Sequence, residues 1–142
     1  MEKILIVDDS AVQAEQLSAI LAGEYNVTAA QTAAEGLREA GSGDYSLILM
    51  DVVMPEMDGF TLLKKLQEQP VTKNIPVILI TGLSDVEYEQ RGLMLGAVDY
   101  ITKPLRPPVV KARVHTHIKL YNYRREFEEH SMLDPLTGIA NR

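Results

Sequence analysis

Five short apolar runs, separated by segments of helical pattern, constrain the fold of this chain more than any other feature. Four of the five show no alternation of apolar and polar residues, as is typical of parallel strands that are covered on both faces. The runs cover residues 4–7, 25–30, 47–50, 77–80 and 98–101. Regular alternation of strand and helix predicts a doubly wound α/β fold, whose ligand site lies beyond the carboxyl ends of the strands.

Helix boundaries are marked by capping residues. Three pairs match the capping box, in which a hydroxyl and a side chain three residues later satisfy the first free amides: Ser10 with Gln13, Thr32 with Glu35, and Ser84 with Glu87. Asp58 is a fourth cap, opening a helix over 59–68 whose apolar residues Phe60, Leu63 and Leu66 face the sheet. Helices are expected to stop at Gly23, Gly41 and Gly96.

Length and composition exclude several classes of protein. A chain of 142 residues suffices for one domain and an appended helix. It has no cysteine, so disulfides and thiolate metal sites are excluded. Its apolar runs are too short for a membrane helix, and its start does not resemble a signal peptide, so we expect a cytoplasmic protein without a membrane partner. Residues 1–105 carry a net charge of −9 and residues 106–142 one of +3, and so acidic a body argues against binding nucleic acid.

Reactive side chains collect where the predicted strands end. Asp8 and Asp9 follow the first strand, Asp51 the third, Thr81 the fourth and Lys103 the fifth. A lone aspartate at a strand end is usually only a cap or turn former. Several such residues at the same edge of a sheet point instead to a functional site.

Three carboxylates within a few ångströms repel one another unless a cation compensates them. Mg²⁺ is the cation that takes one or two carboxylates while retaining water and phosphate oxygens as ligands. Lys103 and Thr81 supply a charge and a hydroxyl for a phosphoryl group, and a carboxylate such as Asp51 can attack phosphorus to form an aspartyl phosphate. The predicted chemistry is therefore Mg²⁺-dependent phosphoryl transfer.

With these residues in place, the chain resembles the receiver domain of response regulators in two-component signalling. The resemblance rests on ILIVDDS at 4–10, LILMDVVMPEMDGF at 47–60, IPVILITG at 75–82 and GAVDYITKP at 96–104. It covers about residues 1–120 and implies a flavodoxin-like five-stranded parallel sheet with strand order 2-1-3-4-5. Pro107 and Pro108 stand where relatives more often have acidic residues, which leaves the start of the last helix open.

The resemblance also implies a role for each matching residue. Asp51 is then the phosphoacceptor, and Asp8, Asp9, Asp51 and the backbone carbonyl of Val53 hold Mg²⁺. Thr81 and Lys103 contact the phosphoryl group, and the Lys103–Pro104 peptide bond is cis. Tyr100 stands at the position of an aromatic switch that swings inward, although a half-buried strand residue is an equally good interpretation of it.

The last predicted helix starts near Pro108 and continues to about Ser131. A first stripe, formed by Val110, Val114, Ile118 and Tyr121, can pack on the sheet. A second stripe, formed by Leu120, Tyr123, Phe127 and His130, steps by three and four residues as in a coiled coil and predicts a dimer seam. A single frayed extension is the alternative. The spacing of His115 and His117 turns them to nearly opposite sides of a helix, so they are not expected to bind a metal together.

Residues 134–142, DPLTGIANR, resemble the opening motif of the GGDEF domain of diguanylate cyclases. We therefore divide the chain into a receiver domain (1–120), a linker helix (121–133) and the first residues of an output domain (134–142). This chain would then catalyse only its own phosphorylation and dephosphorylation, and a longer parent protein would be the cyclase.

The resemblance implies as partners a sensor histidine kinase or phosphotransfer protein and a second copy of the chain. The homodimer would form through the last helix or through the face of the fourth helix and fifth strand. Two rival functions are weaker. An aspartate-nucleophile phosphatase needs an acid two residues after the nucleophile, where this chain has Val53. A receiver that is never phosphorylated would not need the complete acidic set.

Overall fold

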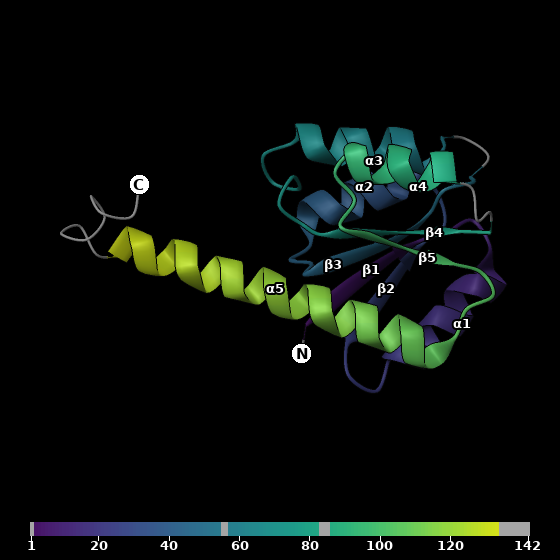
Figure 1. Ribbon diagram of the computed structural model, residues 1–142, viewed down its shortest axis with the longest axis horizontal. Coiled ribbons are helices and arrows are strands. Elements are labelled where there is room, and N and C mark those ends of the chain that lie inside the picture. The colour runs from purple at the N-terminus through teal and green to yellow at the C-terminus, as the bar shows by residue number, and fades with distance from the viewer. Residues whose placement is uncertain (1, 55–56, 83–85, 134–142) are drawn as a thin grey trace.

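Five strands and five helices alternate strictly along the part of the chain that the structure describes. The structure is a computed structural model, and it describes residues 2–54, 57–82 and 86–133. In chain order the elements are β1 (Lys3–Val7), α1 (Ala11–Leu21), β2 (Asn26–Ala30), α2 (Ala33–Ser42), β3 (Leu47–Asp51), α3 (Gly59–Glu68), β4 (Val77–Thr81), α4 (Val86–Met94), β5 (Asp99–Thr102) and α5 (Pro107–Leu133). Figure 1 shows how they are arranged.

The strands form one parallel sheet in the order β2-β1-β3-β4-β5, which confirms the predicted fold class and strand order. Helices α2, α3 and α4 lie on one side of the sheet and α1 and α5 on the other (Figure 1). Each face has its own apolar core, one built with residues of α2 and α3 and the other with residues of α1 and α5. Every residue of β3 and β4 is buried, as their unbroken apolar sequences predict.

Most of the predicted helix boundaries are confirmed. Ser10, Thr32 and Asp58 each accept a hydrogen bond from the backbone amide three residues later, whereas Ser84 lies outside the described residues. The stop predicted at Gly41 is wrong. Helix α2 continues to Ser42, and the amide of Gly43 still donates to the carbonyl of Glu39, so the helical bond pattern ends two residues later than expected.

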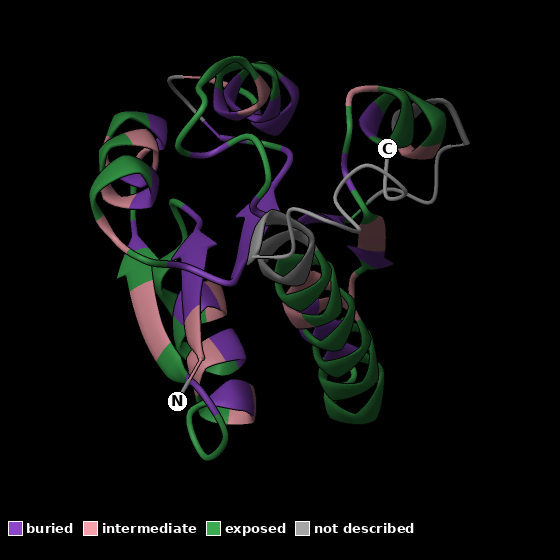
Figure 2. Ribbon diagram, turned by 90° about the vertical axis from the view of Figure 1, so that its left-hand side faces the viewer, coloured by how far each residue is buried: buried purple, intermediate pink, exposed green. Residues whose placement is uncertain are grey.

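Helix α5 runs without interruption from Pro107 to Leu133, so it begins one residue before the predicted start and ends two after the predicted end. Val110, Val114 and Ile118 are buried against the sheet, as predicted, whereas Tyr121, the fourth residue of that stripe, is only half-buried. The helix then extends past the sheet (Figure 1), and its residues from 119 to 127 are mostly exposed (Figure 2). No break separates residues 120 and 121, so the backbone does not mark the predicted boundary between domain and linker.

The second stripe of α5 lies in this exposed part. Leu120, Tyr123 and Phe127 are 58%, 66% and 67% exposed, whereas the side chain of His130 is outside the described part. None of the helices among the described residues is long and apolar enough to cross a membrane.

Candidate functional site

The candidate site lies at the carboxyl edge of the sheet, where the strand order reverses between β1 and β3. Val7 is in register with Met50, so the next residues, Asp8 and Asp51, are level with each other. Strand connections diverge to opposite faces of the sheet at such a point and leave a crevice, which is where parallel α/β folds bind ligands. The two carboxylates therefore stand at the mouth of this crevice.

Asp8, Asp9 and Asp51 lie close enough together to share one cation. One ligand oxygen from each lies within 4.8 Å of those of the other two. Asp8 and Asp51 are only 1% and 5% exposed, whereas Asp9 is exposed to solvent. Hard carboxylate oxygens, two of them buried beside an open third, fit the oxygen ligands and retained waters of Mg²⁺.

The backbone around Gly59 fixes the position of Asp51. The amide of Gly59 donates to the carbonyl of Val52 at 2.7 Å and joins the start of α3 to the end of β3. A Cβ atom at residue 59 would lie 2.6 Å from the carbonyl oxygen of Asp51 and 2.9 Å from the Cα of Val52. Only glycine permits so close an approach, so the Asp58-Gly59 step packs α3 directly beneath the carboxylate.

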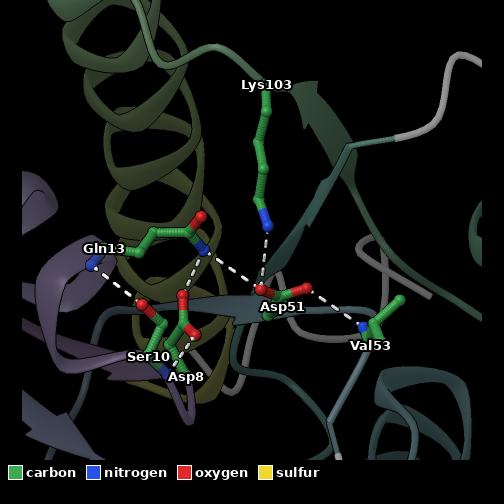
Figure 3. Close-up of polar contacts among 6 residues, drawn as sticks. All are labelled: Asp8, Ser10, Gln13, Asp51, Val53 and Lys103. Carbon is green, nitrogen blue, oxygen red and sulfur yellow. Dashed lines mark hydrogen bonds and ion pairs between the residues drawn. The ribbon is translucent and has the colours of Figure 1, made fainter.

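Both oxygens of Asp51 accept hydrogen bonds (Figure 3). The backbone amide of Val53 donates to Oδ1 at 3.0 Å, and the ammonium of Lys103 lies 3.1 Å from Oδ2. Lys103 follows β5 and reaches across the edge of the sheet, and its peptide bond to Pro104 is cis, as the resemblance implies. The side chain of Val53 is 67% exposed and offers no acid beside Asp51.

Gln13 belongs to this cluster, although its place in the sequence predicts only a role in the capping box. The capping box predicts that its side chain returns to the amide of Ser10, but Oδ1 of Asp8 already accepts from that amide at 2.9 Å. The Gln13 side chain instead donates from Nε2 to Oδ2 of Asp8, in a short contact, and to Oδ2 of Asp51 at 3.1 Å (Figure 3). The run DDS could have given the signal, because an aspartate two residues before a cap can satisfy the cap's own amide.

Burial and the neighbouring carboxylate disfavour the negative charge of Asp8. Burial raises the pKa of Asp8; the hydrogen bond from the Ser10 amide counteracts this, and the negative charge of Asp51 adds to it. Lys103, through its charge, and Gln13, through its amide, favour the ionised form of Asp8. The described protein groups therefore leave excess negative charge that a divalent cation would neutralise.

Thr81 and Tyr100 lie on the neighbouring strands β4 and β5, where Tyr100 is in register with Leu79 and Thr81 with Thr102. Thr81, the last residue of β4, is 3% exposed. Tyr100 is half-buried on β5, and the hydrogen bond between its hydroxyl and Glu89 of α4 raises the pKa of Tyr100. Both residues line a cavity of about 10 Å³, so in this conformation Tyr100 is a half-buried strand residue with little space beneath it.

This arrangement brings together a buried carboxylate with an ammonium beside it, three carboxylates whose oxygens suit a cation, and a nearby threonine. The sequence model of a protein family, the response regulator receiver domain, matches residues 4–115 of this chain. A Vibrio cholerae protein described as "Probable cyclic di-GMP phosphodiesterase" is 44% identical over 116 residues, which are 82% of this chain and 26% of that protein. The response regulator PleD of Caulobacter vibrioides is 41% identical over 115 residues, covering 80% of this chain and 25% of its own. The chain thus spans about a quarter of the length of these relatives.

Solved structures show the same fold. A CheY-like receiver domain protein from Methanospirillum hungatei has a TM-score of 0.81 at 30% identity, covering 87% of this chain and 98% of its own. The receiver domain of a signal transduction histidine kinase from Syntrophus aciditrophicus has a TM-score of 0.76 at 41% identity, with 84% and 91% covered. By sequence and by fold, the chain belongs to the receiver domain family of two-component response regulators.

Proposed function

We propose that Asp51 is the residue that accepts the phosphoryl group. The observation that supports this most is its placement: it ends the buried strand β3, is 5% exposed, and lies 3.1 Å from the ammonium of Lys103. A carboxylate oxygen of Asp51 attacks phosphorus, and the bond from phosphorus to the donor breaks, with its electron pair leaving on the donor. Lys103 contacts the phosphoryl oxygens, and Thr81 donates its hydroxyl to another of them.

Asp8, Asp9, Asp51 and the backbone carbonyl of Val53 would hold Mg²⁺. Bound there, the ion neutralises charge that develops on the phosphoryl oxygens. The donor is proposed to be a histidine kinase or phosphotransfer protein, whose ring-protonated phosphohistidine supplies the phosphoryl group and is left as a neutral imidazole. We also propose a cytoplasmic location, which is typical of receiver domains.

A labelling experiment tests this assignment. The protein is incubated with Mg²⁺ and a radiolabelled small phosphodonor such as acetyl phosphate, and the incorporated label is counted. Asp51→Asn is expected to abolish labelling, whereas Asp58→Asn is expected to keep it. Asp58 is a matched control because it is an exposed cap near the same site, and asparagine caps a helix as well as aspartate. Labelling that persists in Asp51→Asn would refute the assignment, and sustained hydrolysis of a phosphomonoester would favour the phosphatase.

Phosphorylation is proposed to change the surface of α4, β5 and α5. The cavity that Thr81 and Tyr100 share holds about one water molecule at 10 Å³, so the phenol ring can enter only if its neighbours on α4 move. Asp99, next to Tyr100, accepts bonds from Arg113 at 2.9 Å and is 3.1 Å from Nε2 of His117, both on α5. A displacement of β5 is therefore passed to α5.

The exposed stripe of Leu120, Tyr123 and Phe127 is the proposed dimer seam, with the face of α4 and β5 as the alternative. Sedimentation with and without Mg²⁺ and beryllofluoride, an analogue of the phosphoryl group, measures this step. We expect beryllofluoride to increase the dimer fraction, and Leu120→Gln with Phe127→Gln to abolish the increase. Lys119→Gln with Glu126→Gln, one residue away at each position, is the control. An unchanged increase in the seam variant would move the interface to α4 and β5.

The output of a longer parent protein is proposed to be turnover of cyclic di-GMP. Residues 134–142, which lie outside the described residues, resemble the start of a GGDEF domain and favour synthesis from GTP. The name of the Vibrio cholerae relative refers to hydrolysis of the same nucleotide, but that relative matches over 26% of its length only. Incubating the full-length protein with GTP, and separately with cyclic di-GMP, distinguishes the two activities.

A further inference from the structure

The carboxamide of Gln13 bridges two of the carboxylates that the proposed function assigns to the metal. Its Nε2 donates to Oδ2 of Asp8 and, at 3.1 Å, to Oδ2 of Asp51 (Figure 3). An amide nitrogen carries two hydrogens, so both bonds can form at once. The amide oxygen is an acceptor and would be repelled by the same carboxylates, which fixes the nitrogen as the end that faces them.

Gln13 is held in this place by the start of α1. Its backbone amide donates to Oγ of Ser10 at 3.2 Å, and the amide of Ser10 donates to Oδ1 of Asp8. One face of the helix start is thus tied to Asp8 through the backbone. The Gln13 side chain has no cap amide left to accept from, and it reaches over the pocket instead.

A cation that binds Asp8 and Asp51 needs the space that this nitrogen occupies. Mg²⁺ takes oxygen ligands at about 2.0–2.1 Å. Nε2 of Gln13 is hydrogen-bonded to Oδ2 of Asp8 and to Oδ2 of Asp51, so it lies between these two oxygens. A cation bound to the same two oxygens would overlap this nitrogen. The amide and the ion therefore exclude each other.

We propose that Gln13 is a positioning residue that competes with the divalent cation for Asp8 and Asp51. In the metal-free protein its amide supplies two donors to carboxylates that would otherwise repel each other, and it must turn away before the ion binds. Gln13 thereby stabilises the metal-free state and weakens metal affinity. This inference rests on the proposed metal site.

The test compares Gln13→Met with Gln16→Met. Methionine keeps an unbranched side chain of similar length and removes both donors, and Gln16 is an exposed glutamine on the same helix. Calorimetric titration with Mg²⁺ alone measures affinity, and melting in EDTA and in saturating Mg²⁺ measures stability. Gln13→Met removes the hydrogen bonds to Asp8 and Asp51, and these bonds exist only in the metal-free protein. Because only that state is destabilised, Mg²⁺ is expected to bind Gln13→Met about tenfold more tightly. Gln16→Met is expected to bind as the wild type does.

The melting temperature separates competition from a merely structural role. Competition predicts that Gln13→Met melts lower than wild type in EDTA but equally in saturating Mg²⁺. Equal losses in both conditions, with unchanged affinity, would overturn the inference. Weaker Mg²⁺ binding would also overturn it, because Gln13 would then assist the metal. If the wild type binds no Mg²⁺ at all, the proposed metal site itself fails.

Two further measurements do not depend on the folding of Gln13→Met. Gln13→Glu replaces the donors by a fourth carboxylate and is expected to bind Mg²⁺ more tightly than wild type; weaker binding would contradict competition. In the wild-type protein, the side-chain amide resonances of Gln13 are expected to shift during an NMR titration with Mg²⁺. Resonances that stay in place while the metal binds would show that the amide does not move.

Discussion

Replacement of Asp8 by asparagine is predicted to stabilise the metal-free protein at neutral pH. Asp8 is 1% exposed, and one of its oxygens lies within 4.8 Å of one from Asp51. Asparagine has nearly the same shape and keeps an acceptor for the Ser10 amide. Its own amide would face the amide of Gln13, so the bond between residues 8 and 13 is lost, whereas the bond from Gln13 to Asp51 can remain. The substitution thus removes a buried charge and preserves the turn.

The size of the effect follows from the spacing of the charges. Two carboxylates at that distance repel by about 3.5 kcal/mol if the effective dielectric constant is about 20. Lys103 and Gln13 offset part of this repulsion, which leaves a net gain of about 1–2 kcal/mol for Asp8→Asn. For a domain of this size the melting temperature is expected to rise by about 3–8 °C.

The pH dependence has a definite sign. Burial, with the charge of Asp51, raises the pKa of Asp8 above its ordinary value of 3.8, so the folded protein binds this proton more tightly than the unfolded chain. The wild type therefore gains stability relative to Asp8→Asn as the pH falls through the raised pKa. The difference between the two proteins closes near pH 3.8.

Urea unfolding followed by circular dichroism, in EDTA and between pH 7 and pH 4, measures these differences. Added Mg²⁺ should stabilise the wild type and have little effect on Asp8→Asn. A variant that is less stable than wild type in EDTA at pH 7 would refute the reasoning, because the bonds of the carboxylate would then outweigh its repulsion.

Three other substitutions probe the rest of the structure. Gly59→Ala places a methyl group 2.6 Å from the carbonyl oxygen of Asp51 and should cost about 2–3 kcal/mol in urea unfolding and slow phosphorylation; an unaffected variant would show that α3 can shift freely. Burial raises the pKa of Asp99, but the hydrogen bonds it accepts outweigh burial and lower it below 3.8. Asp99→Asn should therefore lose about 1–2 kcal/mol at pH 7 and approach the stability of the wild type as the pH falls from 3.8 through the lowered pKa. A deficit that persists in acid would assign the loss to packing. Thr72→Val removes a buried bond of 2.7 Å to the carbonyl of Leu66 and should cost about 1 kcal/mol without changing Mg²⁺ affinity, which calorimetry can check.

The fold could be predicted from the sequence because its strands are apolar without interruption. Leu47 to Met50 and Val77 to Ile80 can only be buried on both sides, and parallel order then brings the residues that end them to one edge. The proximity of Asp8, Asp51 and Lys103 follows from this geometry. It requires no knowledge of side-chain conformation.

Side-chain direction could not be predicted in the same way. Gln13 fits the capping box, and only the competing bond from the Ser10 amide to Asp8 turns it into the site. Likewise, the pairing of His117 with Asp99 joins residues 18 positions apart on different elements. Local sequence patterns predict the backbone conformation. Side-chain contacts such as these depend instead on which of several possible donors binds a given acceptor in the folded structure.

Because α5 is one continuous helix, its length determines the direction in which its end faces relative to the sheet. Asn122 donates to the carboxylate of Glu2, and Arg113 to that of Asp99, so the buried half of the helix is fixed against rotation. Each residue inserted between Asn122 and Leu133 would rotate whatever follows by about 100° and advance it by about 1.5 Å. Insertion of seven residues nearly restores the original direction, whereas insertion of two rotates it by about 200° and so roughly reverses it. The length of this segment therefore determines how any domain attached after α5 would be rotated relative to the sheet.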